Sequence, residues 1–130
     1  MATFSAISKE RLSTCDERIQ RVMYEVVKTF DCTIIEGHRG EAEQNRAVSQ
    51  GKSKVKFPNG KHNSLPSKAV DVMPFPVDWK DVKRMCYFAG YVMATSLSMG
   101  IKLRWGYDWD GDKDLNDQTF YDGPHFELVD

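Results

Sequence analysis

The chain has 130 residues, of which 41% are hydrophobic, and its 18 basic and 19 acidic side chains give a formal net charge of −1. This size predicts one domain over residues 1–130 with a single core. The balanced charge gives no reason to expect a nucleic-acid partner, because phosphates favour a strongly basic surface. No apolar stretch reaches the roughly 20 residues that membrane insertion needs.

The N-terminal half is predicted to contain two helices, one strand and a long loop. Apolar residues recur at helical spacing over residues 8–30, which indicates one amphipathic helix. Residues 32–35 are rich in β-branched side chains and favour a short strand. A short helix over residues 41–50 is expected to end at Gly51. Residues 51–67 contain glycine, proline, asparagine and several lysines, so they predict a surface loop, and long loops often carry function.

The C-terminal half predicts a strand over residues 68–73 and then a helix. Asp78 is the expected cap of that helix, with Asp81 at its third position and Gly100 at its end. One apolar face of the helix is predicted from Val82, Met85, Cys86, Ala89, Met93 and Leu97. The remaining elements are a strand over residues 101–105, a polar loop over 107–123 and a final strand over 125–129. The predicted fold is α+β, with a small, mostly antiparallel sheet flanked by helices.

Asp71 is a charged residue inside an otherwise apolar strand. An ionised carboxylate in that position loses its hydration and needs a cation or strong hydrogen-bond donors. A position at a sheet edge, or an ion pair with Lys68, would satisfy that need. A metal ion is the more specific alternative.

Two histidines are candidates to complete a metal site with this aspartate. His62 lies nine residues earlier, in the predicted loop, and His125 begins the last strand. Alternation along that strand directs Phe126 to the opposite face from His125. Asp122 precedes His125 by three residues, across a Gly-Pro turn, which can bring a carboxylate beside a metal ligand. Two imidazoles and one carboxylate leave one position of tetrahedral zinc open for water, as a catalytic site requires.

Three segments, GKHNSLPSKAVDVMP, IKLRWGYDW and YDGPHFEL, carry a family resemblance. They resemble the zinc D-Ala-D-Ala carboxypeptidase and L-alanyl-D-glutamate endopeptidase family, above all its small single-domain phage endolysins. The resemblance runs through nearly the whole chain in the family's order. Many members place the aspartate seven residues after the first histidine, whereas the spacing here is nine. The Ala-Val-Asp core is kept, which favours a longer loop with the same ligands.

The resemblance implies roles for individual residues. One zinc ion would be held by three ligands: His62, Asp71 and His125. Asp122 would be the general base that activates water and later protonates the leaving amine. Arg39 matches a Gly-x-Arg element ahead of Gln44 and would bind the scissile carbonyl. Such a role suits a fixed guanidinium group.

Further candidates flank these residues. Glu127 shares a strand face with His125 and is expected either to orient that imidazole or to be a plain surface glutamate. Ser64 and Ser67 lie in the loop between two predicted ligands, where their hydroxyl or backbone groups are candidates for substrate contact.

An acidic stretch begins at Asp108 and includes Asp110 and Asp112. It resembles a calcium loop, but an EF-hand needs glycine at the sixth position and glutamate at the twelfth. Those positions hold Lys113 and Thr119 here. The preferred interpretation is a solvated acidic loop, with a weak Ca²⁺ site at Asp108, Asp110 and Asp112 as the alternative.

The leading functional hypothesis is hydrolysis of the L-Ala–D-Glu bond in the peptidoglycan stem peptide. The N-terminal segment has no apolar stretch typical of a secretory signal, which favours a phage endolysin over an exported enzyme. We expect a monomer made in the host cytoplasm that acts on the periplasmic cell wall after membrane permeabilisation. The alternatives are a D-Ala-D-Ala carboxypeptidase or dipeptidase with the same metal site, and a non-catalytic wall-binding or virion module.

Overall fold

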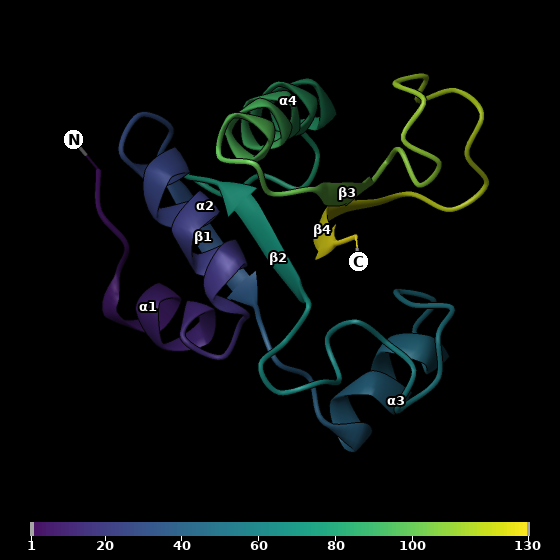
Figure 1. Cartoon of the computed structure of the whole chain (residues 1–130). Coiled ribbons are helices and arrows are strands. Elements are labelled where there is room, and N and C mark those ends of the chain that lie inside the picture. The colour runs from purple at the N-terminus through teal and green to yellow at the C-terminus, as the bar shows by residue number, and fades with distance from the viewer. Residues whose placement is uncertain (1, 130) are drawn as a thin grey trace.

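The computed structural model describes residues 2–129 and contains, within them, four helices and four strands. In chain order these are α1 (Ala6–Leu12), α2 (Glu17–Val27), β1 (Cys32–Glu36), α3 (Glu41–Ser49), β2 (Ala69–Pro74), α4 (Val82–Ser98), β3 (Leu103–Gly106) and β4 (Asp122–Leu128). Figure 1 shows α3 standing apart from the other three helices, beside the loops that follow β1 and precede β2.

The four strands form one sheet in the order β1-β2-β4-β3, and every neighbouring pair is antiparallel. This confirms the α+β prediction with its small antiparallel sheet. The two central strands, β2 and β4, pair in a register that sets Asp71 opposite His125. Two residues 54 positions apart in sequence are therefore neighbours on rigid strands.

The prediction of one long N-terminal helix is wrong, because the chain turns between α1 and α2. Asp16 is the N-cap of α2, and its side chain accepts a hydrogen bond from the backbone N–H of Arg18 at 2.9 Å. The backbone N–H of Asp16 also donates to the carbonyl of Ser67 at 2.8 Å, and that of Ser67 donates to the carbonyl of Thr14 at 2.8 Å. These long-range bonds replace the helical ones and tie the turn to the segment before β2.

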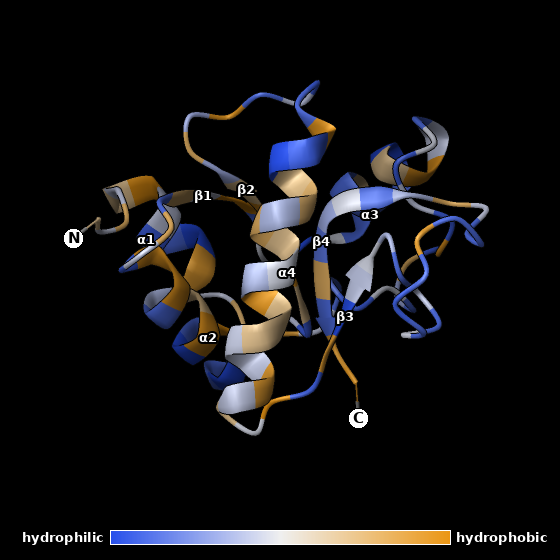
Figure 2. Ribbon diagram, turned by 90° about the horizontal axis from the view of Figure 1, so that it is seen from above, coloured by the Kyte–Doolittle hydropathy of each residue, from blue (hydrophilic) through white to orange (hydrophobic). Residues whose placement is uncertain are grey.

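Helix α4 also differs from its prediction, both in its N-cap residue and in which of its residues face the core. Asp81 is its cap and accepts from the backbone N–H of Arg84 at 3.1 Å, whereas Asp78 accepts from Lys80 one turn earlier. The buried positions are Met85, Phe88, Ala89, Val92 and Ser96. Two expected core residues, Val82 and Leu97, are exposed. Figure 2 shows the hydrophilic N-terminal end of α4, with β3 and β4 beside the helix.

The core lies between the helices α2 and α4 and one face of the sheet. Phe126 and Leu128 of β4 are fully buried there with Phe88 of α4, as the strand alternation predicted. Strand β4 begins at residue 122, three residues earlier than expected, so Asp122 belongs to the strand and pairs with Gly106. Within residues 2–129, no helix combines the length and apolar character needed to cross a membrane.

Candidate metal and catalytic site

The residues His62, Asp71 and His125 converge on one buried point. Nε2 of His62 lies 3.1 Å from Oδ1 of Asp71 and 3.2 Å from Nδ1 of His125. The third side of this triangle, from Nδ1 of His125 to Oδ1 of Asp71, measures 3.3 Å. All three side chains are buried. Strand register brings Asp71 and His125 together, and the loop before β2 brings His62 to them.

The ring nitrogens that face away from this point fix the orientation of both imidazoles. Nδ1 of His62 lies 2.7 Å from the carbonyl oxygen of Gly37, and Nε2 of His125 lies 2.8 Å from Oε1 of Glu127. A carbonyl and a carboxylate only accept hydrogen bonds, so the nitrogen facing each must carry the proton. In the neutral rings, Nε2 of His62 and Nδ1 of His125 therefore point lone pairs at the carboxylate oxygen of Asp71. Three acceptors this close require a cation between them, so the group can hold a metal ion.

The electrostatics of the site agree with that requirement. Burial disfavours the charged form of Asp71, but the adjacent His62 and His125 outweigh burial and hold the pKa of its carboxyl well below the usual range. Burial likewise lowers the pKa of His125, whereas its hydrogen bonds to Asp71 and Glu127 raise it, with a net rise to about 10. The site thus attracts positive charge: a proton when no metal is bound, and a metal cation otherwise.

Asp122 lies beside this group at the start of β4. Its Oδ2 is 3.9 Å from Nδ1 of His125, too far for a hydrogen bond but close enough to share a water molecule. Burial, together with the negative charge of Asp71, raises the pKa of the Asp122 carboxyl to about 6. A carboxyl with that pKa exchanges protons readily near neutral pH, which is what a general base and acid must do.

Arg39 is held rigidly beside the same group. Its Nε donates to Oε1 of Glu36 at 3.0 Å, and its Nη1 donates to Oε1 of Gln44 at 3.0 Å. Its Nη2 lies 3.5 Å from Oδ2 of Asp71. The guanidinium is almost buried and fixed at two points, so it presents a positive charge next to the candidate metal-binding group without the entropy cost of a mobile side chain.

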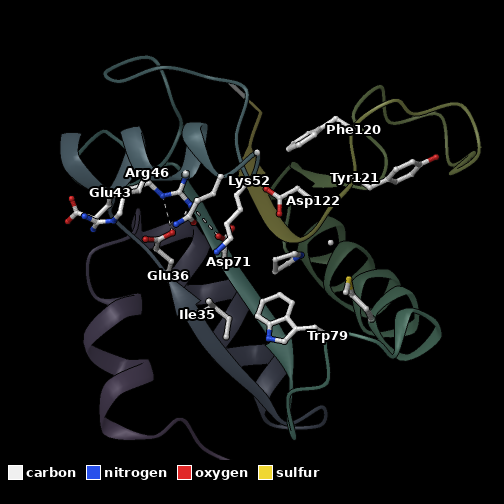
Figure 3. A pocket seen from close by; sticks show the side chains of 17 residues that line it. Ile35, Glu36, Glu43, Arg46, Lys52, Asp71, Trp79, Phe120, Tyr121 and Asp122 are labelled. Carbon is white, nitrogen blue, oxygen red and sulfur yellow. Dashed lines mark hydrogen bonds and ion pairs between the residues drawn. The ribbon is translucent and has the colours of Figure 1, made fainter.

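An open cleft runs along both sides of this group, and Figure 3 shows one of its two arms. The wide arm encloses about 630 Å³ and includes Glu36, Arg46, Asp71, Trp79, Met85 and Tyr121 in its lining. The basic arm encloses about 390 Å³ and includes Lys54, Lys61, His62, Arg104, Trp109 and His125. Four residues line both arms: Arg39, Lys52, Phe120 and Asp122. The two arms therefore adjoin each other at the candidate catalytic residues.

The chain matches known proteins over nearly its full length. A family model described as phage L-alanyl-D-glutamate peptidase matches residues 1–129. The chain belongs to this family. It is 30% identical to the L-alanyl-D-glutamate peptidase of Escherichia phage T5, over 97% of each chain. The crystal structure of the Serratia marcescens L-Ala D-Glu endopeptidase ChiX superimposes with a TM-score of 0.74 and 28% identity, covering 98% of this chain and 90% of that one.

The remaining site residues predicted from the sequence of this phage peptidase family member do not all lie at the cleft. Glu127 is buried against His125, and Gln44 is fully buried and holds Arg39. Ser64 and Ser67 line neither arm of the cleft. The hydroxyl of Ser67 is fully buried and donates to the carbonyl of Ala69 at 2.7 Å, which is a role in the fold.

The acidic loop between β3 and β4 brings together carboxylates of Asp108, Asp110 and Asp112, with the last two exposed. Oxygens of all three accept hydrogen bonds from backbone N–H groups of the same loop. Oδ1 of Asp108 is different, because it is buried and has no hydrogen-bond partner within residues 2–129. That unpartnered oxygen supports the weak Ca²⁺ site, whereas the exposure of Asp110 and Asp112 supports the solvated-loop interpretation.

Sequence reasoning missed three contributors to the site. The carbonyl of Gly37 orients His62, Glu36 anchors Arg39, and the Trp109 ring packs 5.4 Å from that of His125. The sequence marked this glycine only by its place in the Gly-x-Arg element, and the structure adds the reason for it, since a Cβ there would lie 2.4 Å from the carbonyl oxygen of Arg11. Only glycine allows that close approach of two backbone segments.

Proposed function

We propose that this chain is a zinc-dependent endopeptidase that hydrolyses the L-Ala–D-Glu bond of peptidoglycan stem peptides. The observation that carries the proposal is the triangle of three acceptor atoms of His62, Asp71 and His125, with sides of 3.1 to 3.3 Å. Tetrahedral zinc with ligand bonds near 2.0–2.1 Å separates its ligand atoms by about 3.3 Å. Two nitrogens and one carboxylate oxygen are also the ligand types of catalytic zinc sites. When bound, the ion would polarise the scissile carbonyl and acidify a water molecule.

The surrounding side chains have complementary tasks in this reaction. Asp122, with a pKa raised to about 6, takes a proton from the attacking water and returns it to the leaving amine. Arg39 donates hydrogen bonds to the oxygen of the scissile carbonyl as negative charge develops on it. Gln44 positions Arg39, and Glu127 positions the imidazole of His125, so neither needs to touch the substrate.

The choice of the L-Ala–D-Glu bond rests on the relatives. The phage T5 relative and the Serratia structure both carry that activity in their names, and each aligns with nearly the whole chain. We further propose that the protein acts as a monomer, made in the host cytoplasm, on the periplasmic cell wall of a permeabilised cell. A weak Ca²⁺ site at Asp108, Asp110 and Asp112 is a separate proposal, which an unchanged melting temperature in added calcium would contradict.

Product identification tests the proposed reaction. The protein is incubated with purified muropeptides, with and without a strong chelator, and the products are identified by mass spectrometry. The proposal expects a new amino terminus on D-glutamate, and no cleavage in the chelator. Release of free D-alanine alone would identify a D-Ala-D-Ala carboxypeptidase instead. Intact muropeptides under all conditions, together with no bound zinc, would favour a non-catalytic wall-binding module.

A further inference from the structure

The two arms of the cleft differ in charge. Beside its histidines, the lining of the basic arm includes five cationic side chains, Arg39, Lys52, Lys54, Lys61 and Arg104, and only two carboxylates, Asp122 and Glu127. The wide arm instead includes four carboxylates, Glu36, Glu43, Asp71 and Asp122, against three cations, Arg39, Arg46 and Lys52. An extended ligand with one anionic half is therefore attracted into the cleft in a single direction.

Most cations of the basic arm already have a partner. Arg39 is paired with Glu36, and Nη1 of Arg104 lies 3.9 Å from Oε2 of Glu127. Nζ of Lys61 donates to the carbonyl of Leu128 at 3.0 Å, and Nζ of Lys54 lies over the Phe120 ring, 5.1 Å from its centroid. These side chains are thus engaged in holding the protein's own groups.

Lys52 differs in both position and partners. It lines both arms, and so lies where they meet at Arg39 and Asp122. Within residues 2–129, no carboxylate lies within ion-pair distance of its ammonium group. Figure 3 shows its side chain extending into the cleft on the same side as Asp71.

The backbone at Lys52 is held in place, although its side chain is exposed. Gly51 adopts a φ of +75° and ends α3, and the N–H of Lys52 then donates to the carbonyl of Ala47 at 2.8 Å. The next N–H, that of Ser53, donates to the same carbonyl at 3.2 Å. This closure of the helix end aims the residue at the cleft.

The proposed substrate carries a carboxylate next to its scissile bond, just as Lys52 lies next to the candidate catalytic residues. Glutamate has two carboxyl groups, and the chain continues through only one of them. One free carboxylate therefore lies on the leaving side of the L-Ala–D-Glu bond, on the same residue that carries the scissile nitrogen. The preceding L-alanine brings no ionisable side chain. The substrate thus has the same asymmetry as the cleft.

We propose that Lys52 binds the free carboxylate of the D-glutamate residue and that the anionic, leaving half of the stem peptide lies in the basic arm. This inference rests on the proposed function and adds a specificity determinant to it. An ammonium–carboxylate hydrogen bond made in the bound complex strengthens substrate binding more than it speeds the chemical step.

The test uses two peptides that contain the L-Ala–D-Glu bond, one with the glutamate carboxylate free and one with it converted to the amide. Wild type, Lys52→Met, Lys52→Arg and the control Lys56→Met are compared in their zinc-loaded forms. Lys56 lies in the same loop but lines neither arm. For Lys52→Met we expect KM on the free carboxylate to rise about tenfold with kcat little changed, and no effect on the amide. Lys52→Arg should recover part of the loss, and Lys56→Met should match wild type.

The possible outcomes distinguish a failure of the role of Lys52 from a failure of the proposed endopeptidase function. If wild type cleaves both peptides equally well and Lys52→Met does the same, the L-Ala–D-Glu activity stands and the role of Lys52 is wrong. An equal loss on both peptides would also reject that role, because it would not depend on the carboxylate. If wild type cleaves neither peptide, the proposed function fails and this inference fails with it.

Discussion

Nε2 of His62 lies 3.2 Å from Nδ1 of His125, and each is the nitrogen left without a proton when its ring is neutral. Two lone pairs at that distance repel each other, and the carboxylate of Asp71 beside them adds a third acceptor. The surrounding fold nevertheless holds all three in place, through the carbonyl of Gly37, the carboxylate of Glu127 and the pairing of β2 with β4. This arrangement of three acceptor atoms favours a cation between them.

The bond between His125 and Glu127 predicts a change in metal affinity. Glu127→Gln removes the negative charge that makes the His125 ring a better donor of electrons to a metal, while keeping the size of the side chain. We expect zinc affinity to fall at least about tenfold, as measured by competition with a fluorescent chelator. Glu25→Gln, on the exposed face of α2, is the control and should leave affinity unchanged. Equal zinc affinities in the two variants would show that Glu127 does not strengthen metal binding.

Asp122 is predicted to act on the reaction and not on the metal. Asp122→Asn keeps the side-chain shape but cannot take a proton from water, so turnover should fall by about 100-fold or more. Its zinc content, measured by atomic absorption, should equal that of wild type. His125→Ala, by contrast, should lose both the metal and activity. Substantial turnover by Asp122→Asn would show that another group is the base.

The pH profile should have an acid limb set by Asp122. Only the ionised carboxylate can accept a proton, and burial raises its pKa to about 6, so activity is present above that pH and is lost as pH falls through it. A bound cation favours the ionised form and moves the midpoint to lower pH. Zinc content must be followed in parallel, since protons compete for the two imidazoles in acid. A rate that stays level down to pH 4 with zinc still bound would contradict this role.

Gly37 is predicted to be indispensable for a geometric reason. An alanine Cβ there would lie 2.4 Å from both the carbonyl oxygen of Arg11 and Oγ1 of Thr14, so the backbone must shift. Gly37→Ala should lower the free energy of unfolding of the metal-free protein by about 1–3 kcal/mol in urea titrations. It should also weaken zinc binding by displacing the carbonyl that holds His62. Gly90→Ala is the control, because open space surrounds that position on α4 and alanine should stabilise the helix by about 0.5–1 kcal/mol.

Local patterns in the sequence predicted much of the site. Asp71 stood out because a carboxylate interrupts an apolar strand, and alternation along β4 separated His125 from the buried Phe126. The family resemblance supplied His62 and Arg39, which no local pattern distinguishes from surface residues. The register that pairs Asp71 with His125 joins strands far apart in the chain, so it depends on packing of the whole sheet.

The errors have the same non-local origin. The break between α1 and α2 depends on hydrogen bonds to Ser67, more than 50 residues away, so apolar periodicity continued through it. The buried face of α4 includes Phe88 and Val92 because the sheet lies on that side. The apolar pattern of the helix alone was also compatible with a neighbouring face, which is the one that was predicted. Lys52 drew no notice because one lysine in a lysine-rich loop has no distinguishing local signal.

Anomalous X-ray diffraction at the zinc absorption edge tests whether one metal ion lies between His62, Asp71 and His125. Crystals of the protein, grown without added metal, should give a strong anomalous peak about 2.0–2.1 Å from Nε2 of His62 and from Nδ1 of His125. The same peak should be absent from crystals of His125→Ala. A wild-type crystal of the active protein that shows no peak there, with the two nitrogens still in contact, would contradict the account.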